Sequence, residues 1–195
     1  MRFIAAGLLI VGALAAVGFA HRESRVREQD RLAAIASELA GRPVGVRCPG
    51  FFSSLVNVRT EGGYVKFHED GQPFDHTDLS PETCSALRHI DRVDFDCIAR
   101  GDCTFKQFKA AWAIHTVAHE SFHLRGFAAE ATAECYGLQN TAFVAERLGL
   151  DSELAQRIQK WVYVRGYPNE PDDYRSEDCR DGGRLDLRPQ SAVFP

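Results

Sequence analysis

Two histidines and a glutamate form the pattern H-E-x-x-H at residues 119–123, beyond the middle of the chain. Side chains four residues apart in a helix lie on one face, so His119 and His123 would project together, with Glu120 beside the first. Paired imidazoles at this spacing are typical of Zn²⁺ ligands, and the adjacent carboxylate is typical of a general base. Because a catalytic zinc ion takes three protein ligands and keeps one position for water, the rest of the chain must supply a third ligand.

Two further carboxylates follow the motif, beyond a turn expected at Gly126. Glu130 and Glu134 are four residues apart and therefore share one face of a helix. A short turn brings that helix back alongside the histidines. Either glutamate is a candidate for the third metal ligand.

Residues 112–140 resemble the zincin metallopeptidases, and more narrowly the gluzincins, whose third zinc ligand is a glutamate. The resemblance implies that the two histidines of the motif bind zinc and that its glutamate is the general base. It also implies that Glu130 is the third ligand and that Glu134 orients a histidine from outside the ligand set. The connection to Glu130 is shorter than is usual in gluzincins, which leaves open whether Glu130 or Glu134 reaches the metal. In the metzincin branch the third histidine would fall at Ala129, so that branch does not fit.

The implied function is that of a zinc-dependent, metallopeptidase-like hydrolase acting on a peptide or protein substrate. Zinc acidifies water, Glu120 takes the proton, and the hydroxide attacks an amide carbonyl. The alternative is a catalytically inactive zincin-like protein of the cell envelope that binds metal or a partner. A donor to the oxyanion is expected from His115, Tyr136 or Tyr174. Each also has a plainer role. His115 could support the site or the core, Tyr136 could pack a helix, and Tyr174 could anchor the tail.

A second group of polar side chains lies in the segment 68–79, which we expect to be a loop. It contains His68, Asp70, Asp75 and His76. Scattered histidines and aspartates in a polar loop are usually solvated, so we do not expect them to form a second metal site.

Composition favours one globular domain that does not bind nucleic acid. The chain has 195 residues, of which 45% are hydrophobic and 26% charged, enough for one sizeable core. The net charge of -4 and the scattered arginines provide no basic surface for a phosphate backbone. The sequence predicts neither the substrate nor the oligomeric state.

Residues 1–20 have the pattern of a signal peptide or a signal anchor, and the apolar run 3–20 is long enough to hold the protein in a membrane. The arginines around this run argue against export, because one precedes it and four follow it: Arg2, then Arg22, Arg25, Arg27 and Arg31. The cysteines favour export, to the periplasm, the exterior or the outer face of a membrane.

The chain has an even number of cysteines and no C-x-x-C pair, which predicts three disulfides formed in an oxidising compartment. The candidates are Cys48, Cys84, Cys97, Cys103, Cys135 and Cys179. Only the pairing of Cys97 with Cys103, across a short loop containing glycine, is predicted from spacing. Cys179 is expected to fasten the carboxy-terminal tail to the body. The alternative is a set of buried free thiols in a cytosolic protein.

The expected fold is α+β and mainly helical, with a small amino-terminal sheet on a zincin-like core of the H-E-x-x-H helix and an antiparallel glutamate-bearing helix, stapled by disulfides. The expected divisions are a leader (1–20), a stalk or docking helix (21–42), a zincin-like metal-binding domain (43–166) and an extended tail (167–195). Periodicity and end signals predict strands at 44–48 and 63–67 and helices at 23–39, 80–90, 104–125, 127–148 and 151–166.

Overall fold

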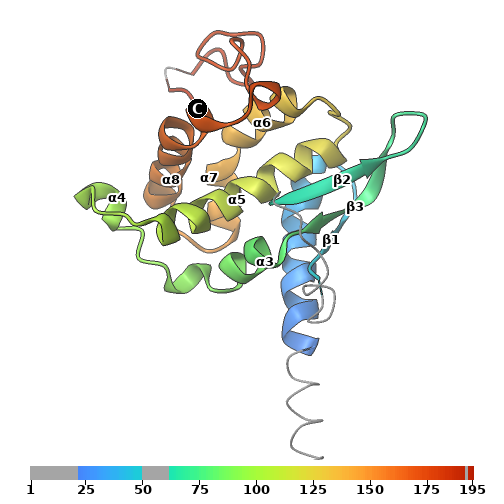
Figure 1. The fold of residues 1–195 in the computed structure, drawn as a ribbon, viewed down its shortest axis with the longest axis horizontal. Coiled ribbons are helices and arrows are strands. Elements are labelled where there is room, and N and C mark those ends of the chain that lie inside the picture. The colour runs from blue at the N-terminus through green and yellow to red at the C-terminus, as the bar shows by residue number, and fades with distance from the viewer. Residues whose placement is uncertain (1–21, 50–61, 192) are drawn as a thin grey trace, which may run out of the picture.

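One long helix, α5 (Phe105–Leu124), runs through the middle of the molecule, with the other elements arranged around it (Figure 1). The structure is a computed structural model that describes residues 22–49, 62–191 and 193–195. The leader expected at 1–20 lies outside these residues. The remaining elements are β1 (Gly45–Arg47), β2 (Gly63–Phe67), β3 (Pro73–Leu79), α3 (Pro81–Arg88), η1 (Ile90–Arg92), α4 (Cys97–Arg100), α6 (Glu130–Leu138), α7 (Thr141–Arg147), α8 (Ser152–Arg165), η2 (Tyr167–Asn169) and η3 (Asp172–Tyr174), where η denotes a 3₁₀ helix.

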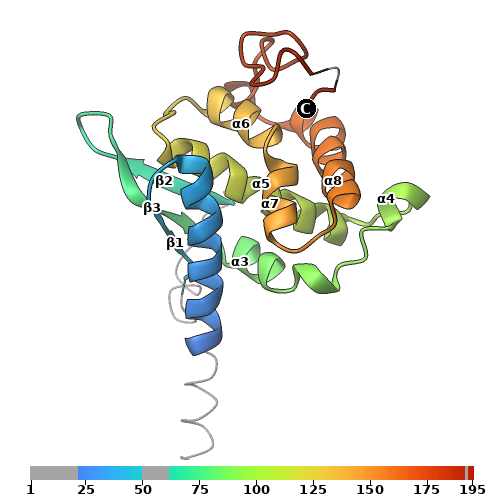
Figure 2. The same cartoon turned by 180° about the vertical axis from the view of Figure 1, so that it is seen from behind.

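An amino-terminal helix, described from residue 22 to residue 40, precedes the sheet, as the sequence predicts. Its first turns are exposed and project from the domain, whereas its second half buries Leu32, Ile35 and Ala36 in the core (Figures 1 and 2). The Ser37 hydroxyl accepts a hydrogen bond from the Val44 N–H at 3.0 Å, which fixes the helix to the chain leading into β1. The thin apolar stripe of this helix therefore packs against the core of the domain.

The sheet has three strands in the order β1-β3-β2, with β1 parallel and β2 antiparallel to β3. Strand β2 has the predicted bounds, and β1 lies within its predicted range. The prediction that residues 68–79 form a loop is wrong, because Pro73–Leu79 is the central strand β3. Its polar side chains give a weak strand signal, but pairing on both edges stabilises the strand. The central strand of the sheet is therefore one that the local sequence does not predict.

The predicted helix ends are correct where a local capping signal exists. Ser80 caps α3 by accepting the Thr83 N–H at 3.1 Å, and Asp151 caps α8 by accepting the Leu154 N–H at 2.9 Å. Thr104 and Gln107 form the predicted capping box at the start of α5. Helix α3 ends at Arg88, and Ile90 lies in the following 3₁₀ turn.

The single helix predicted over residues 127–148 is wrong, because the chain forms two helices, α6 and α7. Residues 127–129 belong to the turn after α5, and Asn140 separates α6 from α7 with φ -120° and ψ 7°. The Asn140 side-chain amide donates to the Tyr136 carbonyl at 2.8 Å. A side chain that bonds the local backbone in this way offers an alternative to the helical ladder.

All six cysteines are paired, in the disulfides Cys48–Cys84, Cys97–Cys103 and Cys135–Cys179. The predicted pairing of Cys97 with Cys103 is confirmed, and the alternative of free thiols is wrong. Three disulfides in a chain of this size are typical of an oxidising compartment outside the cytoplasm. In the described part of the chain, none of the helices has the length and apolar character needed to cross a membrane.

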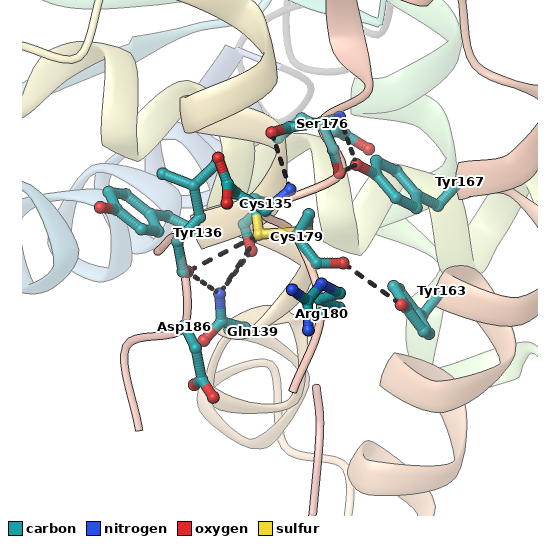
Figure 3. The surroundings of a disulfide bond; sticks show 12 residues. Cys135, Tyr136, Gln139, Tyr163, Tyr167, Ser176, Cys179, Arg180 and Asp186 are labelled. Atoms are coloured by element: carbon teal, nitrogen blue, oxygen red, sulfur yellow. Dashed lines mark hydrogen bonds between the residues drawn. A yellow bond between two sulfur atoms is a disulfide. The ribbon is translucent and has the colours of Figure 1, made fainter. Parts of the chain in front are cut away.

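The segment predicted as an extended tail, beyond α8, contains two short 3₁₀ turns, η2 and η3. Figure 3 shows it fastened to α6 by the disulfide Cys135–Cys179. The Tyr167 hydroxyl accepts the Ser176 N–H at 2.8 Å, and the Tyr163 hydroxyl donates to the Cys179 carbonyl at 3.4 Å. The predicted attachment of the tail through Cys179 is confirmed.

Candidate metal centre

Three histidines lie one turn apart along α5, on the side that faces α6. His115, His119 and His123 are only 1%, 7% and 4% exposed, respectively. Helix α5 is buried on most of its circumference from Ala110 to Leu124, so these rings need polar partners inside the protein. The partners come from α6, from the turn that precedes it and, for His115, from Thr141 at the start of α7.

The outer cluster consists of His119 Nε2, His123 Nε2 and the Glu130 carboxylate. The two Nε2 atoms lie 3.0 Å apart, and Glu130 Oε2 lies 3.2 Å from His119 Nε2 and 3.0 Å from His123 Nε2. Ligands about 2.0 Å from a tetrahedral ion lie roughly 3.3 Å from one another. The three atoms therefore have nearly the separations of ligands around one small cation.

The opposite nitrogen of each ring has a partner that only accepts hydrogen bonds. His119 Nδ1 lies 2.8 Å from Glu134 Oε2, and His123 Nδ1 lies 2.7 Å from the Phe127 carbonyl oxygen. Both Nδ1 atoms are therefore donors, which assigns the hydrogen of a neutral ring to Nδ1 and leaves a lone pair on Nε2. Three lone-pair atoms, two nitrogens and one carboxylate oxygen, thus converge on one point, and only a cation or added protons can satisfy them.

The inner cluster consists of His115, His119 Nδ1 and the Glu134 carboxylate, and it is almost completely buried. Glu134 Oε2 lies 2.9 Å from His115 Nε2 and 2.8 Å from His119 Nδ1. These separations fit two N–H groups donating to one carboxylate oxygen. The Thr141 hydroxyl lies 3.1 Å from His115 Nδ1. Although three such groups could also hold a metal, hydrogen atoms account for the contacts of the inner cluster.

Glycine at position 137 allows α6 to approach α5 closely at the clusters. A Cβ atom at Gly137 would lie 2.9 Å from His119 N and Cα, and 3.2 Å from His115 Cε1. Carbon atoms do not approach backbone this closely without a shift of the helix. The absence of a side chain at Gly137 therefore brings Glu134, one turn earlier on α6, within reach of both rings.

The end of α5 positions His123 through the backbone. The Gly126 N–H donates to His123 O at 2.9 Å and the Phe127 N–H donates to Phe122 O at 3.1 Å, which is the Schellman pattern. Gly126 has φ +111°, a conformation that favours glycine. The motif turns the Phe127 carbonyl back to accept from His123 Nδ1, so the helix cap fixes the ring of a candidate metal ligand.

Glu120 is buried on the side of α5 that faces the sheet, beside strands β2 and β3. The Thr77 hydroxyl of β3 lies 3.3 Å from its Oε2, and a Cβ atom at Gly63 of β2 would lie 3.0 Å from its Oε1. Burial raises the pKa of the Glu120 carboxyl, and the neighbouring His119 and His123 act in the opposite direction. A carboxylate with a raised pKa beside two candidate ligands is suited to accept a proton.

The charges of the two clusters are strongly coupled. Burial would lower the pKa of His119, but hydrogen bonds and charge attraction from Glu130 and Glu134 raise it to about 10. Burial would raise the pKa of Glu130, but His119 and His123 hold it well below its usual range. Burial would also raise the pKa of Glu134, but His115 and His119 lower it to about 2. The outer and inner clusters together therefore contain two carboxylates and attract positive charge, either as protons or as a metal ion.

The fastened tail lies against the same region. The Tyr174 ring stacks on the His119 ring with 5.7 Å between centroids and 16° between planes. Glu170 is half-buried nearby, and burial followed by the charge of Glu134 raises its pKa. The tail thus forms one wall beside the outer cluster, which matches the expectation that Tyr174 would lie near the site.

The other residues named from the sequence have different surroundings. Tyr136 packs against Phe122 and Phe127, with ring centroids 5.4 and 5.0 Å away. His68 stacks on Phe74, and His76 Nδ1 lies 2.8 Å from Asp75. Among the described residues, the groups that could hold a metal are the outer and inner clusters, and His68, Asp70, Asp75 and His76 belong to neither.

Several residues of the centre are absent from the sequence-based prediction. Thr77 and the Phe127 carbonyl come from segments whose structure was predicted incorrectly. Gly137 carries a signal, because an isolated glycine inside a helical pattern often marks a close approach. Thr141 carries none, since its role depends on the position of α7 relative to α5.

No protein-family model, curated protein or solved structure matches the chain. The resemblance to zincins therefore rests on the motif and on the buried groups around it.

Proposed function

We propose that the protein is a zinc-dependent, metallopeptidase-like hydrolase whose ligands are His119, His123 and Glu130. The observation that carries the proposal is the convergence of two Nε2 lone pairs and one carboxylate oxygen within 3.2 Å of one another. Two imidazoles and one carboxylate are a common ligand set for catalytic zinc. Glu134 remains outside the set and orients His119, as the engagement of its oxygen by Nδ1 supports.

Bound at this site, zinc would acidify water and polarise a carbonyl group. Glu120 would accept a proton from the attacking water and pass it to the leaving amine. Its burial and its position between the ligand histidines and the sheet support this role. The Thr77 hydroxyl lies 3.3 Å from Glu120 Oε2 and 3.0 Å from the Tyr64 carbonyl oxygen, so its hydrogen is shared between two acceptors and restrains the Glu120 carboxylate only in part.

Strand β2 supports a peptide as the substrate. It runs past the centre, with Gly63 against Glu120 and with Phe67 edge-on to the His123 ring at 6.0 Å. In the described residues β2 pairs with β3 along one edge only. The other edge offers backbone N–H and C=O groups to an extended peptide, which is a common way to bind one.

The test is to measure bound zinc and peptide hydrolysis on the full chain and on two variants. Glu120→Gln should keep zinc and lose hydrolysis of a broad peptide library by about 100-fold or more, because the general base is removed. Glu153→Gln, at an exposed position on α8, should match the parent protein in both measurements. A parent protein without zinc would overturn the metal assignment. Zinc without hydrolysis would instead support the alternative of a metal-binding protein of the cell envelope.

A further inference from the structure

His115 is a buried polar residue that the proposed reaction does not use. Its ring is 1% exposed, and both of its nitrogens have partners: Nε2 lies 2.9 Å from Glu134 Oε2, and Nδ1 lies 3.1 Å from the Thr141 hydroxyl. It does not reach the outer cluster. Its hydrogen-bonded link to that cluster in the described structure runs through the Glu134 carboxylate, and its ring also lies edge-on to the His119 ring with 6.2 Å between centroids.

Glu134 is held at one oxygen only. Oε2 accepts from His115 and from His119, whereas Oε1 is buried and has no hydrogen-bond partner in the described part of the chain. A carboxylate with one engaged oxygen can rotate about its last bond unless two donors fix it from different sides. His115 supplies the second donor, and Thr141 on α7 holds the His115 ring.

We infer that His115 is a positioning residue of the metal centre, which acts through Glu134 to hold the His119 ring with Nε2 directed at His123 and Glu130. The inference rests on the proposed metal function. The chain of contacts spans three helices, from Thr141 on α7 through His115 on α5 and Glu134 on α6 back to His119. Partners outside the ligand set typically change metal affinity by about 10- to 100-fold when they are removed.

The first test replaces His115 with residues of similar size. His115→Phe keeps a ring beside Trp112, whose centroid lies 4.9 Å away, but removes the donor to Glu134. We expect its zinc affinity, measured by competition with a chromophoric chelator, to fall about 10- to 100-fold. His115→Gln retains an N–H that can reach Glu134 and should recover most of the affinity. The visible spectrum of bound Co²⁺ should shift in His115→Phe and return towards that of the parent in His115→Gln.

A matched control separates positioning from packing. Ile114→Val alters a fully buried residue beside His115 without touching either cluster. It should lower the melting temperature and leave zinc affinity and the Co²⁺ spectrum unchanged. A loss of affinity in Ile114→Val as large as that in His115→Phe would assign the effect to packing and overturn the inference.

The second test is a double-mutant cycle with Glu134→Ala. Because His115 acts through Glu134, His115→Phe should change zinc affinity less than about twofold once Glu134 is gone. Losses that multiply in the double variant would overturn the inference. If His115→Phe does not fold, the same cycle is run with His115→Leu, which also lacks the donor to Glu134 and should likewise lose its effect on zinc affinity in the Glu134→Ala background. A parent protein that binds no zinc refutes the metal centre itself, which is a separate result from zinc binding that is insensitive to His115.

Discussion

The outer and inner clusters are built from the same residue types, share His119, and differ in where their hydrogen atoms lie. In the inner cluster the ring nitrogens point N–H groups at a carboxylate. In the outer cluster the ring nitrogens present lone pairs to one another and to a carboxylate 3.0 to 3.2 Å away. The inner cluster is satisfied without a metal, whereas the outer cluster needs either a cation or added protons.

The difference arises from the hydrogen-bond partners of the Nδ1 atoms. At Nδ1, His119 has a carboxylate acceptor and His123 has a backbone carbonyl acceptor. The hydrogen atom of each neutral ring therefore lies on Nδ1 and points away from the outer cluster. His115 has a hydroxyl at Nδ1 and directs Nε2 at Glu134. Spacing along α5 makes the three histidines equivalent, and the groups behind each ring decide which of them can bind a metal.

The largest expected effect comes from deleting ligands of the outer cluster. Structural zinc sites bind with about 10 to 16 kcal/mol, so one ligand of four accounts for roughly 3 to 4 kcal/mol. His123→Ala and Glu130→Ala should therefore weaken zinc binding by about 100- to 1,000-fold. Glu134→Ala should lose about 10- to 100-fold, measured by the same chelator competition. A larger loss from Glu134→Ala than from Glu130→Ala would reverse the roles of the two clusters.

Acidification should weaken metal binding next most strongly. Below its pKa of about 10, His119 holds a proton that a metal ion must displace. Each unit of falling pH should therefore reduce the apparent zinc affinity tenfold, giving about 100-fold between pH 8 and pH 6. Calorimetry in buffers of different ionisation enthalpy should detect one proton released per zinc bound. Affinity independent of pH across this range would contradict the coupling between the clusters.

Separating α5 from α6 should affect both clusters at once. Gly137→Ala places a methyl group 2.9 Å from the His119 backbone, and such overpacking costs about 1 to 3 kcal/mol of unfolding free energy. Zinc affinity should fall with it, because Glu134 retreats from His119. Urea denaturation and zinc titration measure the two effects. Thr132→Ala, a half-buried change on the same helix, should alter neither by more than about 0.5 kcal/mol.

The smallest effect should come from the tail. The Tyr174 ring covers His119, and aromatic pairs contribute about 0.5 to 1.5 kcal/mol. Tyr174→Ala should weaken zinc binding by roughly 2- to 10-fold, measured by the same chelator competition. A zinc affinity that is unchanged in Tyr174→Ala would show that the ring does not support the ligand.

The parts of the molecule that follow from the sequence are those with local signals. Thr104 with Gln107 and Gly126 mark the ends of α5, and the spacing of its histidines places them on one face. Strand β3 lacked such a signal because its pairing partners lie far away in the chain. The preference for Glu130 over Glu134 in the proposed ligand set also depends on the structure, since helical spacing makes both glutamates available and the partners of the ring nitrogens distinguish them.

The Schellman cap gives the connection between α5 and α6 a fixed length. Six residues, from Leu124 to Ala129, separate His123 from Glu130, and three of them build the cap that returns the Phe127 carbonyl to His123. The length of this connection determines where Glu130 lies relative to His123, because one inserted residue would displace the Phe127 carbonyl and rotate Glu130 about the axis of α6. Sequence divergence should therefore be tolerated in the identity of Ala128 and Ala129 far more readily than in their number.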